Sequence, residues 1–451
     1  TNLAILFASK KNENEKAEYY FKKALEISPE NSEALKYFSD FLVSIQRYSE
    51  AKALLEKCLI LVPRNPDVLN LLGQVYKSEN FEKALEFYKN ALHLSEDKES
   101  IQNNIGALYF EFNKVKNAIH YFKKISNSGG STKTLLNLAY AYIADNQFKE
   151  GWEKYEYRWK VDPGDKVVWP LKDKPLWDGK SASGVLLWRE QGIGDDIIFL
   201  GLVPEAYEKA GKDMTVLIDP RLVAMCERSM PGIEFLPAVK GSVQEDRFDY
   251  HLPMGSLPRL FRSSEEDFSK TRESYLKADM ERVEVLRKEL GVEGKKVIGI
   301  SWRSFSPINV ERKSMDLEQF GRMFDGLDVV LLNLQYGDVN EEIRAFTKGT
   351  GIEVLQCSSV NLKEDLDGLG ALIALCDLVV STSNVTIHMA GALGKEAWVL
   401  LPFAASFWWL IERTDSLWYP TVKLYRQKSL QDWSEILKVV RSDLDQRFEK
   451  Q

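Results

Sequence analysis

The chain has 451 residues, which is too long for one ordinary hydrophobic core, so we expect two or three domains. Apolar residues make up 44% and charged residues 28%, the profile of a soluble globular protein. The 60 Lys and Arg and the 67 Asp and Glu give a formal net charge of −7, without any basic block. Sequence-independent binding to nucleic acid needs a basic surface, so this class of function is excluded.

The cysteines and histidines are few and scattered. The four cysteines form no CxxC pair and the four histidines form no HExxH motif, which argues against a disulfide framework and a zinc site. We therefore expect a protein of a reducing, cytoplasmic compartment, with no metal and no bound cofactor. A membrane-spanning helix needs about 18 consecutive apolar residues, and no such run exists.

The first third repeats a helical pattern every 33 or 34 residues. Small residues recur at this interval: Ala17, Ala51, Ala84, Ala118 and Gly151. Four positions after each stands a bulky residue: Phe21, Leu55, Tyr88, Phe122 and Tyr155. The small positions let paired helices approach, and the bulky ones fill the groove between neighbouring units. The pattern resembles the tetratricopeptide repeat and predicts one half-repeat over 12–30 and four units over 31–160.

Arrays of this kind bind an extended peptide or a partner protein on their concave face, so the resemblance implies such a partner here. Polar residues on the predicted first helices are candidates for that face: Asn70, Gln74, Asn103, Asn104 and Asn137. Asn70, Asn104 and Asn137 follow the repeat interval, which predicts a ladder of asparagines. Ordinary solvated helix surface is the alternative.

Residues 161–184 have no helical period and contain three prolines, which predicts a linker. Four apolar residues give it something to bury: Trp169, Leu171, Leu176 and Trp177.

Beyond the linker, apolar runs typical of buried strands alternate with amphipathic helical stretches. The runs are 185–189, 215–219, 297–303, 328–335, 352–356, 377–382 and 397–402. This alternation predicts parallel sheets covered on both faces. A charged helix over 276–290 divides the region into two Rossmann-like lobes, 185–292 and 293–451. Ligands of such sheets bind at the carboxyl ends of the strands.

The first motif, residues 191–197, follows the first strand and opens a helix. Gly194 allows a tight turn, and Asp195 and Asp196 stand at the helix start. A carboxylate there suits a general base for an acceptor hydroxyl. Capping of the helix is the alternative role.

The second motif, residues 381–394, runs from a buried strand into a helix rich in small residues. Hydroxyl and amide side chains gather where that helix presents free N–H groups, which makes a site for a diphosphate. Its candidate residues are Ser383, Asn384, Val385, Thr386 and His388.

Two further loops follow strands of the second lobe. Ser301 and Arg303, with Lys313 further along, form a candidate phosphate clamp. Gln335 and Tyr336 precede a helix that begins with Glu341 and Glu342, and a base near Tyr336 with a ribose on a glutamate would suit a nucleotide.

Taken together, these motifs resemble the bacterial tetratricopeptide-repeat glycosyltransferases, whose catalytic half is similar to the heptosyltransferases of glycosyltransferase family 9. The segments that carry the resemblance are QGIGDD, GISWRS, RKSM, LNLQYGD, STSNVTIHMAGALGK, WVLLP and SLWYP. The resemblance implies a GT-B fold, with acceptor on the N-terminal lobe and nucleotide-sugar donor on the C-terminal lobe. It also implies inverting transfer without a metal, with Asp195 as the base and the other motifs around the donor.

The sequence departs from that family at two points. Asp196 doubles the acid where a Thr or Ser is common. Where many relatives have Asp-Thr before the helix, this chain has Ser383-Asn384 and so lacks a carboxylate for sugar hydroxyls. Two alternatives therefore stay open: a non-catalytic adaptor with a degenerate nucleotide-sugar domain, and a transferase acting on a glycan or a lipid-linked saccharide. The acidic pairs Asp365/Asp367 and Asp443/Asp445 do not follow a strand, so we do not interpret them as a metal site.

Overall fold

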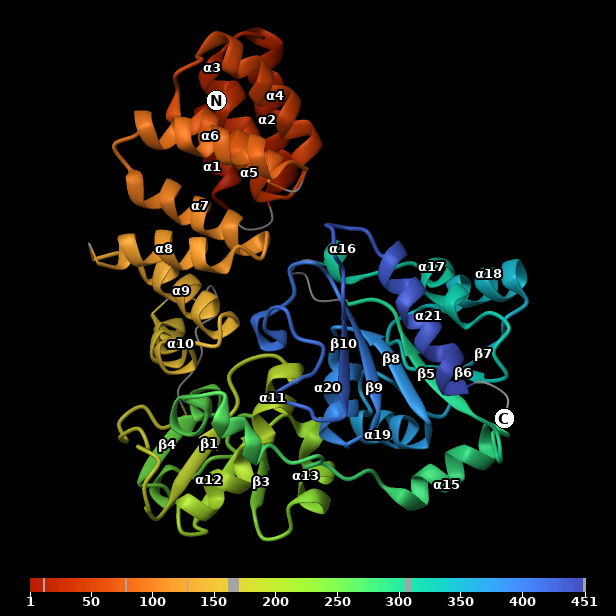
Figure 1. The fold of residues 1–451 in the computed structure, drawn as a ribbon. Coiled ribbons are helices and arrows are strands. Elements are labelled where there is room, and N and C mark those ends of the chain that lie inside the picture. The colour runs from red at the N-terminus through yellow and green to blue at the C-terminus, as the bar shows by residue number, and fades with distance from the viewer. Residues whose placement is uncertain (11–12, 78, 128, 161–169, 305–309, 449–451) are drawn as a thin grey trace. The chain divides into compact units, whose positions relative to one another are not determined.

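The computed structural model describes residues 1–451 except 11–12, 78, 128, 161–169, 305–309 and 449–451. The chain forms two compact units, Thr1–Ala141 and Tyr142–Gln451 (Figure 1). The boundary falls inside a helix, α9 (Thr132–Ala144). The compact units therefore divide about one helix earlier than the predicted end of the repeats at residue 160.

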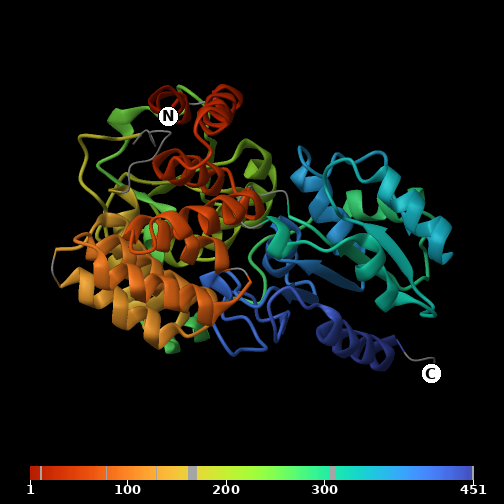
Figure 2. The same cartoon turned by 90° about the horizontal axis from the view of Figure 1, so that it is seen from above.

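Unit 1 consists of helical hairpins whose successive helices lie side by side (Figure 2). Its helices before α9 are α1 (Asn2–Ala8), α2 (Asn14–Ile27), α3 (Ser32–Ser44), α4 (Tyr48–Leu61), α5 (Pro66–Tyr76), α6 (Phe81–Leu94), α7 (Lys98–Glu111) and α8 (Val115–Ser126). Short side chains start several of them by accepting a hydrogen bond from a free backbone N–H. These capping residues are Asn31, Asn65, Asn80 and Asp97. Because α1 packs against α2, the first hairpin is a pair of helices and not the predicted half-repeat.

The repeat interval places a residue without a side chain opposite an aromatic ring. A Cβ atom on Gly106 of α7 would lie 2.5 Å from Cε1 of Phe122 in α8, far inside van der Waals contact. Phe122 is 1% exposed, so its ring has no free space to move into. The close approach of paired helices that the repeat pattern predicts is confirmed at this contact between α7 and α8.

Unit 2 contains two parallel sheets. The first has the strand order β3-β2-β1-β4, with β1 (Val185–Trp188), β2 (Met214–Ile218), β3 (Glu234–Pro237) and β4 (Tyr250–Pro253). Its helices are α11 (Ile193–Leu200), α12 (Val203–Lys209), α13 (Val223–Ser229) and α14 (Leu257–Phe261). Helix α15 (Met280–Glu289) then precedes the second sheet.

The second sheet has the order β10-β9-β8-β5-β6-β7. Its strands are β5 (Val297–Ser301), β6 (Val330–Asn333), β7 (Val354–Leu355), β8 (Leu378–Thr382), β9 (Ala397–Leu401) and β10 (Val422–Arg426). One face packs against α17 (Leu317–Gly321), α18 (Asn340–Thr350) and α21 (Ser434–Phe448) in a single apolar cluster. The other face contacts α19 (Leu366–Leu375) and α20 (Val385–Ala392), while the short α16 (Val310–Lys313) follows β5. Parallel strands covered on both faces agree with the predicted α/β class.

The two sheets of unit 2 are joined through helices that contact each other. Helix α11 packs on α20, and the backbone N–H groups of Tyr275 and Leu276 both donate to the carbonyl of Ala392 at 3.0 Å. Arg282 of α15 pairs with Asp365 just before α19, at 3.0 Å for Nη1 and Oδ1. The carboxyl ends of the strands from both sheets therefore belong to one connected body.

The last repeat ends inside unit 2. Helix α10 (Phe148–Tyr155) continues into a 3₁₀ turn, η1 (Glu156–Trp159), and the indole N–H of Trp152 donates to the carbonyl of Arg262 at 2.9 Å. Of the predicted linker 161–184, residues 161–169, including Trp169, lie outside the described residues. In the rest, Leu171 and Trp177 are buried as predicted. Leu176 is 43% exposed, and its backbone pairs with His251 of β4.

We expect Gly106→Ala to destabilise unit 1, because the added methyl group overlaps the buried ring of Phe122. The cost of such overpacking is about 1–3 kcal/mol. Thermal unfolding followed by circular dichroism measures it. Gly349→Ala is the matched control, since a Cβ on this glycine of α18 meets no atom within 4 Å. Equal effects of the two substitutions would contradict the role of Gly106 in helix packing.

Candidate functional site

Asp195 lies in the first turn of α11, which starts at Gly192 directly after the turn that follows β1. Its side chain is largely enclosed, and this burial raises its pKa to about 6. The indole N–H of Trp408 and the positive charge of Lys313 act against this rise, because both favour the ionised carboxylate. A carboxylate with a pKa near neutrality, within the electrostatic influence of a cation, is suited to accept and release a proton.

Asp196, the second acidic residue of the motif, has a different environment. It is 1% exposed, and its Oδ2 accepts a hydrogen bond from Nε of Arg189 at 2.6 Å. Arg189 also lies 3.7 Å from Asp219. Asp196 is therefore one partner of a partly buried ion pair at the end of β1, and its carboxylate already accepts a hydrogen bond from Arg189. Of the two predicted bases, Asp195 is the one without an arginine partner in the described structure.

Gly194 and His388 bring the two sheets together at this point. A Cβ on Gly194 would lie 3.2 Å from Cδ2 of His388, so α11 and α20 touch where the glycine has no side chain. The imidazole stacks on Trp409 at 5.3 Å between ring centroids, and its Nδ1 lies 3.1 Å from the hydroxyl of Tyr419. Burial, together with Lys313, lowers the pKa of His388 to about 3. His388 is therefore a neutral hydrogen-bonding group at physiological pH and contributes no positive charge.

The start of α20 is held by its own side chains. Oδ1 of Asn384 accepts from the backbone N–H of Thr386 at 2.9 Å, and Nδ2 donates to Oγ of Ser301 at 2.8 Å and to the carbonyl of Arg303 at 3.1 Å. Asn384 thus caps α20 and ties it to the end of β5. Ser383 accepts from Nε1 of Trp409 at 2.9 Å. Val385 is half-buried, and Thr386 donates to the carbonyl of Leu334 at 3.4 Å.

Gln335 organises the loop after β5. Its Oε1 accepts three hydrogen bonds, from Oγ of Ser301 at 3.1 Å, from the backbone N–H of Trp302 at 3.0 Å and from that of Arg303 at 2.9 Å. Its Nε2 donates to the carbonyl of Tyr336 at 3.1 Å. The amide that we predicted near a nucleotide base is used within the protein.

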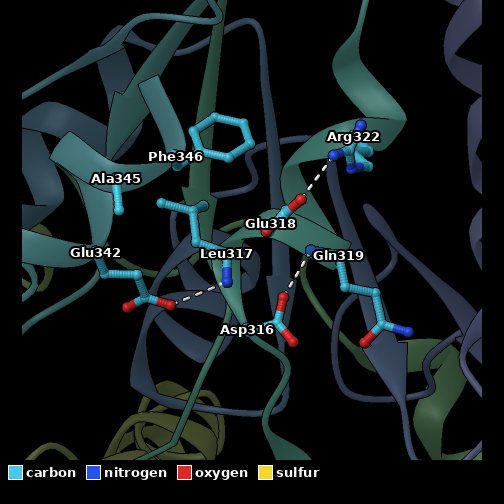
Figure 3. Close-up of a pocket in the computed structure, with 8 residues that line it drawn as sticks. All are labelled: Asp316, Leu317, Glu318, Gln319, Arg322, Glu342, Ala345 and Phe346. Carbon is cyan, nitrogen blue, oxygen red and sulfur yellow. Dashed lines mark hydrogen bonds and ion pairs between the residues drawn. The ribbon is translucent and has the colours of Figure 1, made fainter. Parts of the chain in front are cut away.

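Glu342 holds the same loop from the other side. It accepts from Nε1 of Trp302 at 3.1 Å and from the backbone N–H of Leu317 at 2.9 Å, and it pairs with Arg303. Figure 3 shows Glu342 pointing toward Leu317 at the rim of a cavity of about 510 Å³ between α17 and α18. Arg303 is consequently an ion-pair partner, while the neighbouring Glu341 is exposed.

A second cavity, of about 410 Å³, opens at the carboxyl ends of β6 and β7. Tyr336 and Gln335 line it together with amide side chains from the following loops, Asn340, Gln356 and Asn361. Open α/β sheets bind ligands at this edge. Among the predicted donor residues, Gln335 and Tyr336 therefore border a cavity, and Lys313 lies close to Asp195.

Sequence reasoning missed the aromatic residues that surround Asp195 and His388. Trp408 and Trp409 belong to a 3₁₀ turn after β9, and Tyr419 lies further along the same loop, before β10. Arg426 at the end of β10 holds this turn by donating to the carbonyl groups of Trp409 and Leu410 at 3.1 and 2.8 Å. The run Phe407-Trp408-Trp409 was the available signal, because three aromatic residues in a loop need partners to bury them.

In unit 1 the predicted asparagine ladder exists in a modified form. Nδ2 of Asn104 donates to Oδ1 of Asn70 at 2.9 Å, as the repeat interval predicts. Asn137 instead donates to Oδ1 of Asn103 at 3.0 Å, and Asn103 is buried. The amides form two pairs between first helices rather than one continuous row.

Two tetratricopeptide-repeat family models match the chain, over residues 9–75 and 68–102. The N-terminal region is a tetratricopeptide-repeat array. Protein FlbA of Caulobacter vibrioides is 28% identical over 429 residues, which cover 90% of this chain and 71% of FlbA. The CTR9 homologue of Arabidopsis thaliana is 29% identical over 116 residues, 25% of this chain and 11% of that protein. Among solved structures, YrrB, described as a TPR protein with an unusual peptide-binding site, is 25% identical over 36% of this chain and 84% of its own, with a TM-score of 0.29.

Repeat arrays of this type bind peptides and proteins, so the array supports a protein or peptide partner. In the described part of the chain, no helix is long and apolar enough to cross a membrane. The same residues contain no group of three or more His, Cys, Asp or Glu side chains arranged to hold a metal ion.

We expect Asp195→Asn to stabilise the protein at pH 7.5 and to leave its stability unchanged near pH 4. The folded state raises the pKa of this carboxyl from 3.8 to about 6, so folding disfavours the charged form, and that cost is present only at a pH where Asp195 ionises. The gain at pH 7.5 is about 1–3 kcal/mol. Melting temperatures between pH 4 and 8 measure it.

Asp415→Asn is the control with the opposite sign, because hydrogen bonds from Arg413 lower the pKa of this exposed carboxyl. A stabilisation by Asp195→Asn that is the same at pH 4 and pH 7.5 would show that the charge of Asp195 is not its origin.

Proposed function

We propose that unit 2 is an inverting, metal-independent glycosyltransferase of the GT-B type and that the repeats recruit its acceptor, a protein or peptide. The sheet β3-β2-β1-β4 would form the acceptor lobe and the six-stranded sheet the donor lobe. The observation that carries the proposal is Asp195, a largely enclosed carboxylate with a raised pKa, beside Lys313 and the start of α20.

In this proposal the carboxylate of Asp195 takes the proton from an acceptor hydroxyl. The acceptor oxygen forms a bond to the anomeric carbon of the sugar while the bond from that carbon to the phosphate oxygen breaks. With a pKa of about 6, most Asp195 side chains are ionised at neutral pH and can accept a proton. The pKa is also close to the working pH, which is the condition for an efficient general base.

The departing nucleoside diphosphate gains negative charge, which needs stabilisation in the transition state. Lys313 supplies a cation near Asp195, and the positive end of the α20 dipole lies at Asn384. The neutral His388 supplies a hydrogen-bonding group at the same helix. The cavity of about 410 Å³ beside Tyr336 has room for a base, and its amide side chains offer hydrogen bonds to one.

We expect one family of nucleotides to stabilise the protein in a thermal-shift panel of UDP, GDP, ADP, CMP and their sugars, with and without EDTA. Ligand at about 100 times its dissociation constant adds about 2.7 kcal/mol of stability. An increase in melting temperature that EDTA does not remove supports a metal-independent donor site. The absence of any increase would contradict a donor site.

With the donor identified, Asp195→Asn is expected to lower turnover at least about 100-fold and to change donor affinity less than about twofold, because a general base acts on the acceptor proton. Steady-state kinetics and calorimetry measure the two quantities. Asp246→Asn, an exposed residue of the same lobe, is the matched control and should keep full turnover. Full turnover of Asp195→Asn would remove Asp195 as the base.

A non-catalytic adaptor is the second candidate, and specific contacts favour it. The polar atoms of three candidate donor residues form hydrogen bonds within the protein: those of Asn384, Gln335 and Glu342. In addition, Ser383 stands where many members of the similar family have a carboxylate. An adaptor would keep its cellular role in the Asp195→Asn variant, whereas a transferase would lose it.

A further inference from the structure

The final helix of the repeats, α10, and the turn η1 contact the surroundings of Asp195 by two separate routes. Both elements lie in unit 2, although their sequence continues the repeat pattern. The first route consists of polar contacts to the residues that precede Asp195 in the chain. The second consists of aromatic contacts to the indole of Trp408, which interacts with the Asp195 carboxylate.

The polar route is a buried ion cluster. Nη2 of Arg158 donates to Oε1 of Glu190 at 2.9 Å and to Oγ of Ser256 at 2.8 Å, and Nη1 donates to Glu156 at 2.7 Å. The side chains of Arg158 and Glu190 are 9% and 2% exposed. A pair shielded from water to this degree is rigid, because breaking it leaves a buried charge without a partner.

The cluster fixes the turn that leads into α11. Glu190 and Gln191 directly precede Gly192, the N-cap of α11, and Nε2 of Gln191 donates to the hydroxyl of Tyr155 at 2.6 Å. Two consecutive residues of this turn are thus bound to η1 and α10, and Asp195 follows three positions after Gly192. The position of the turn sets where the first turn of α11 begins.

The aromatic route reaches the carboxylate itself. Trp152 of α10 stacks on Trp408 at 5.9 Å between ring centroids, and Tyr155 meets the same indole edge-on at 6.3 Å. Trp408 in turn interacts with the carboxylate of Asp195 through its indole N–H. The ring of Trp408 also packs on Phe199 of α11 at 5.5 Å, so the indole is held on two sides.

We propose that Arg158, Tyr155 and Trp152 are positioning residues for Asp195, so that the final helix of the repeat array is part of the transfer site. The inference rests on the proposed transferase activity, with Asp195 as its base. Misplacing a catalytic group by about 1 Å costs about 100-fold in rate, which is why a partial loosening of these contacts is measurable.

The test uses the full-length chain and the variants Tyr155→Phe and Arg158→Lys. Tyr155→Phe keeps the ring against Trp408 and removes only the hydroxyl that Gln191 binds. Arg158→Lys keeps the charge and removes the forked contact with Glu190 and Ser256. Arg247→Lys is the matched control, because Arg247 forms a half-exposed ion pair with Glu234 in the same lobe.

Two measurements are made on each variant. Hydrogen exchange followed by mass spectrometry should be faster over residues 189–200 in both test variants and unchanged in the control. With the donor sugar found in the nucleotide panel, kcat should fall about tenfold while the KM for the donor stays within about twofold. The thermal midpoint of Tyr155→Phe should remain within a few degrees of the unsubstituted chain.

Unchanged exchange over 189–200 together with unchanged kcat in both variants would overturn the inference. An equal loss of kcat in Arg247→Lys would overturn it as well, because the effect would then be general destabilisation. If the unsubstituted chain transfers no sugar from any UDP-, GDP-, ADP- or CMP-sugar but the variants still exchange faster over 189–200, the proposed activity fails and the positioning of Asp195 by α10 stands.

Discussion

The contact of α11 with α20 joins the two sheets of unit 2, and it depends on a position that has no side chain. Gly194 lies so close to His388 that a methyl group would enter the imidazole ring's contact distance. Each helix starts at the carboxyl end of a central strand, β1 or β8, so their contact brings together the carboxyl edges of the two sheets. Open α/β sheets in general bind their ligands at these edges. Asp195 is one residue from this contact, and burial raises its pKa to about 6.

Near this contact, several polar side chains form hydrogen bonds with the protein's own loops. The oxygen of Gln335 gathers three donors, Glu342 gathers three more, and Asn384 bridges two strand ends. Such satisfied networks make the loops rigid, because each buried group would be costly to leave without its partner. Rigid loops hold Trp302, Arg303 and the start of α20 in fixed places, which is useful for either binding or catalysis. Because these side chains are already hydrogen-bonded, fewer of their polar atoms can bind a ligand than the sequence motifs predicted.

The sequence was informative where one local rule decides the structure. The repeat interval predicted the helical hairpins and the close approach of paired helices. Continuous apolar runs predicted β1, β2, β5, β6, β7, β8 and β9. It failed for strands whose residues do not form such a run. β3 and β4 have four residues each and end in proline, and β10 alternates apolar with basic residues at the edge of its sheet.

The candidate site could be predicted only in part for a related reason. Residues next to a glycine turn or a helix start stand out in a sequence, so Asp195, His388 and Asn384 could be singled out. Their partners come from distant positions: Trp408 and Tyr419 lie in one long loop, and Arg158 lies in the repeats. Which polar group is already paired depends on those partners, so the residues of the motif alone did not separate Asp195 from Asp196. Only the family resemblance favoured Asp195.

The division of the last repeat between the two units restricts how such a protein can evolve. In a repeat array each unit contacts only its neighbours, so units can be exchanged with the least disturbance where the break crosses few contacts. Here the second helix of the final repeat carries Trp152, Tyr155 and Arg158 into unit 2. A recombination that replaces the array must therefore break ahead of α10, and each new array inherits the same final helix. The helices ahead of α10 can then change while this helix stays with the lobes.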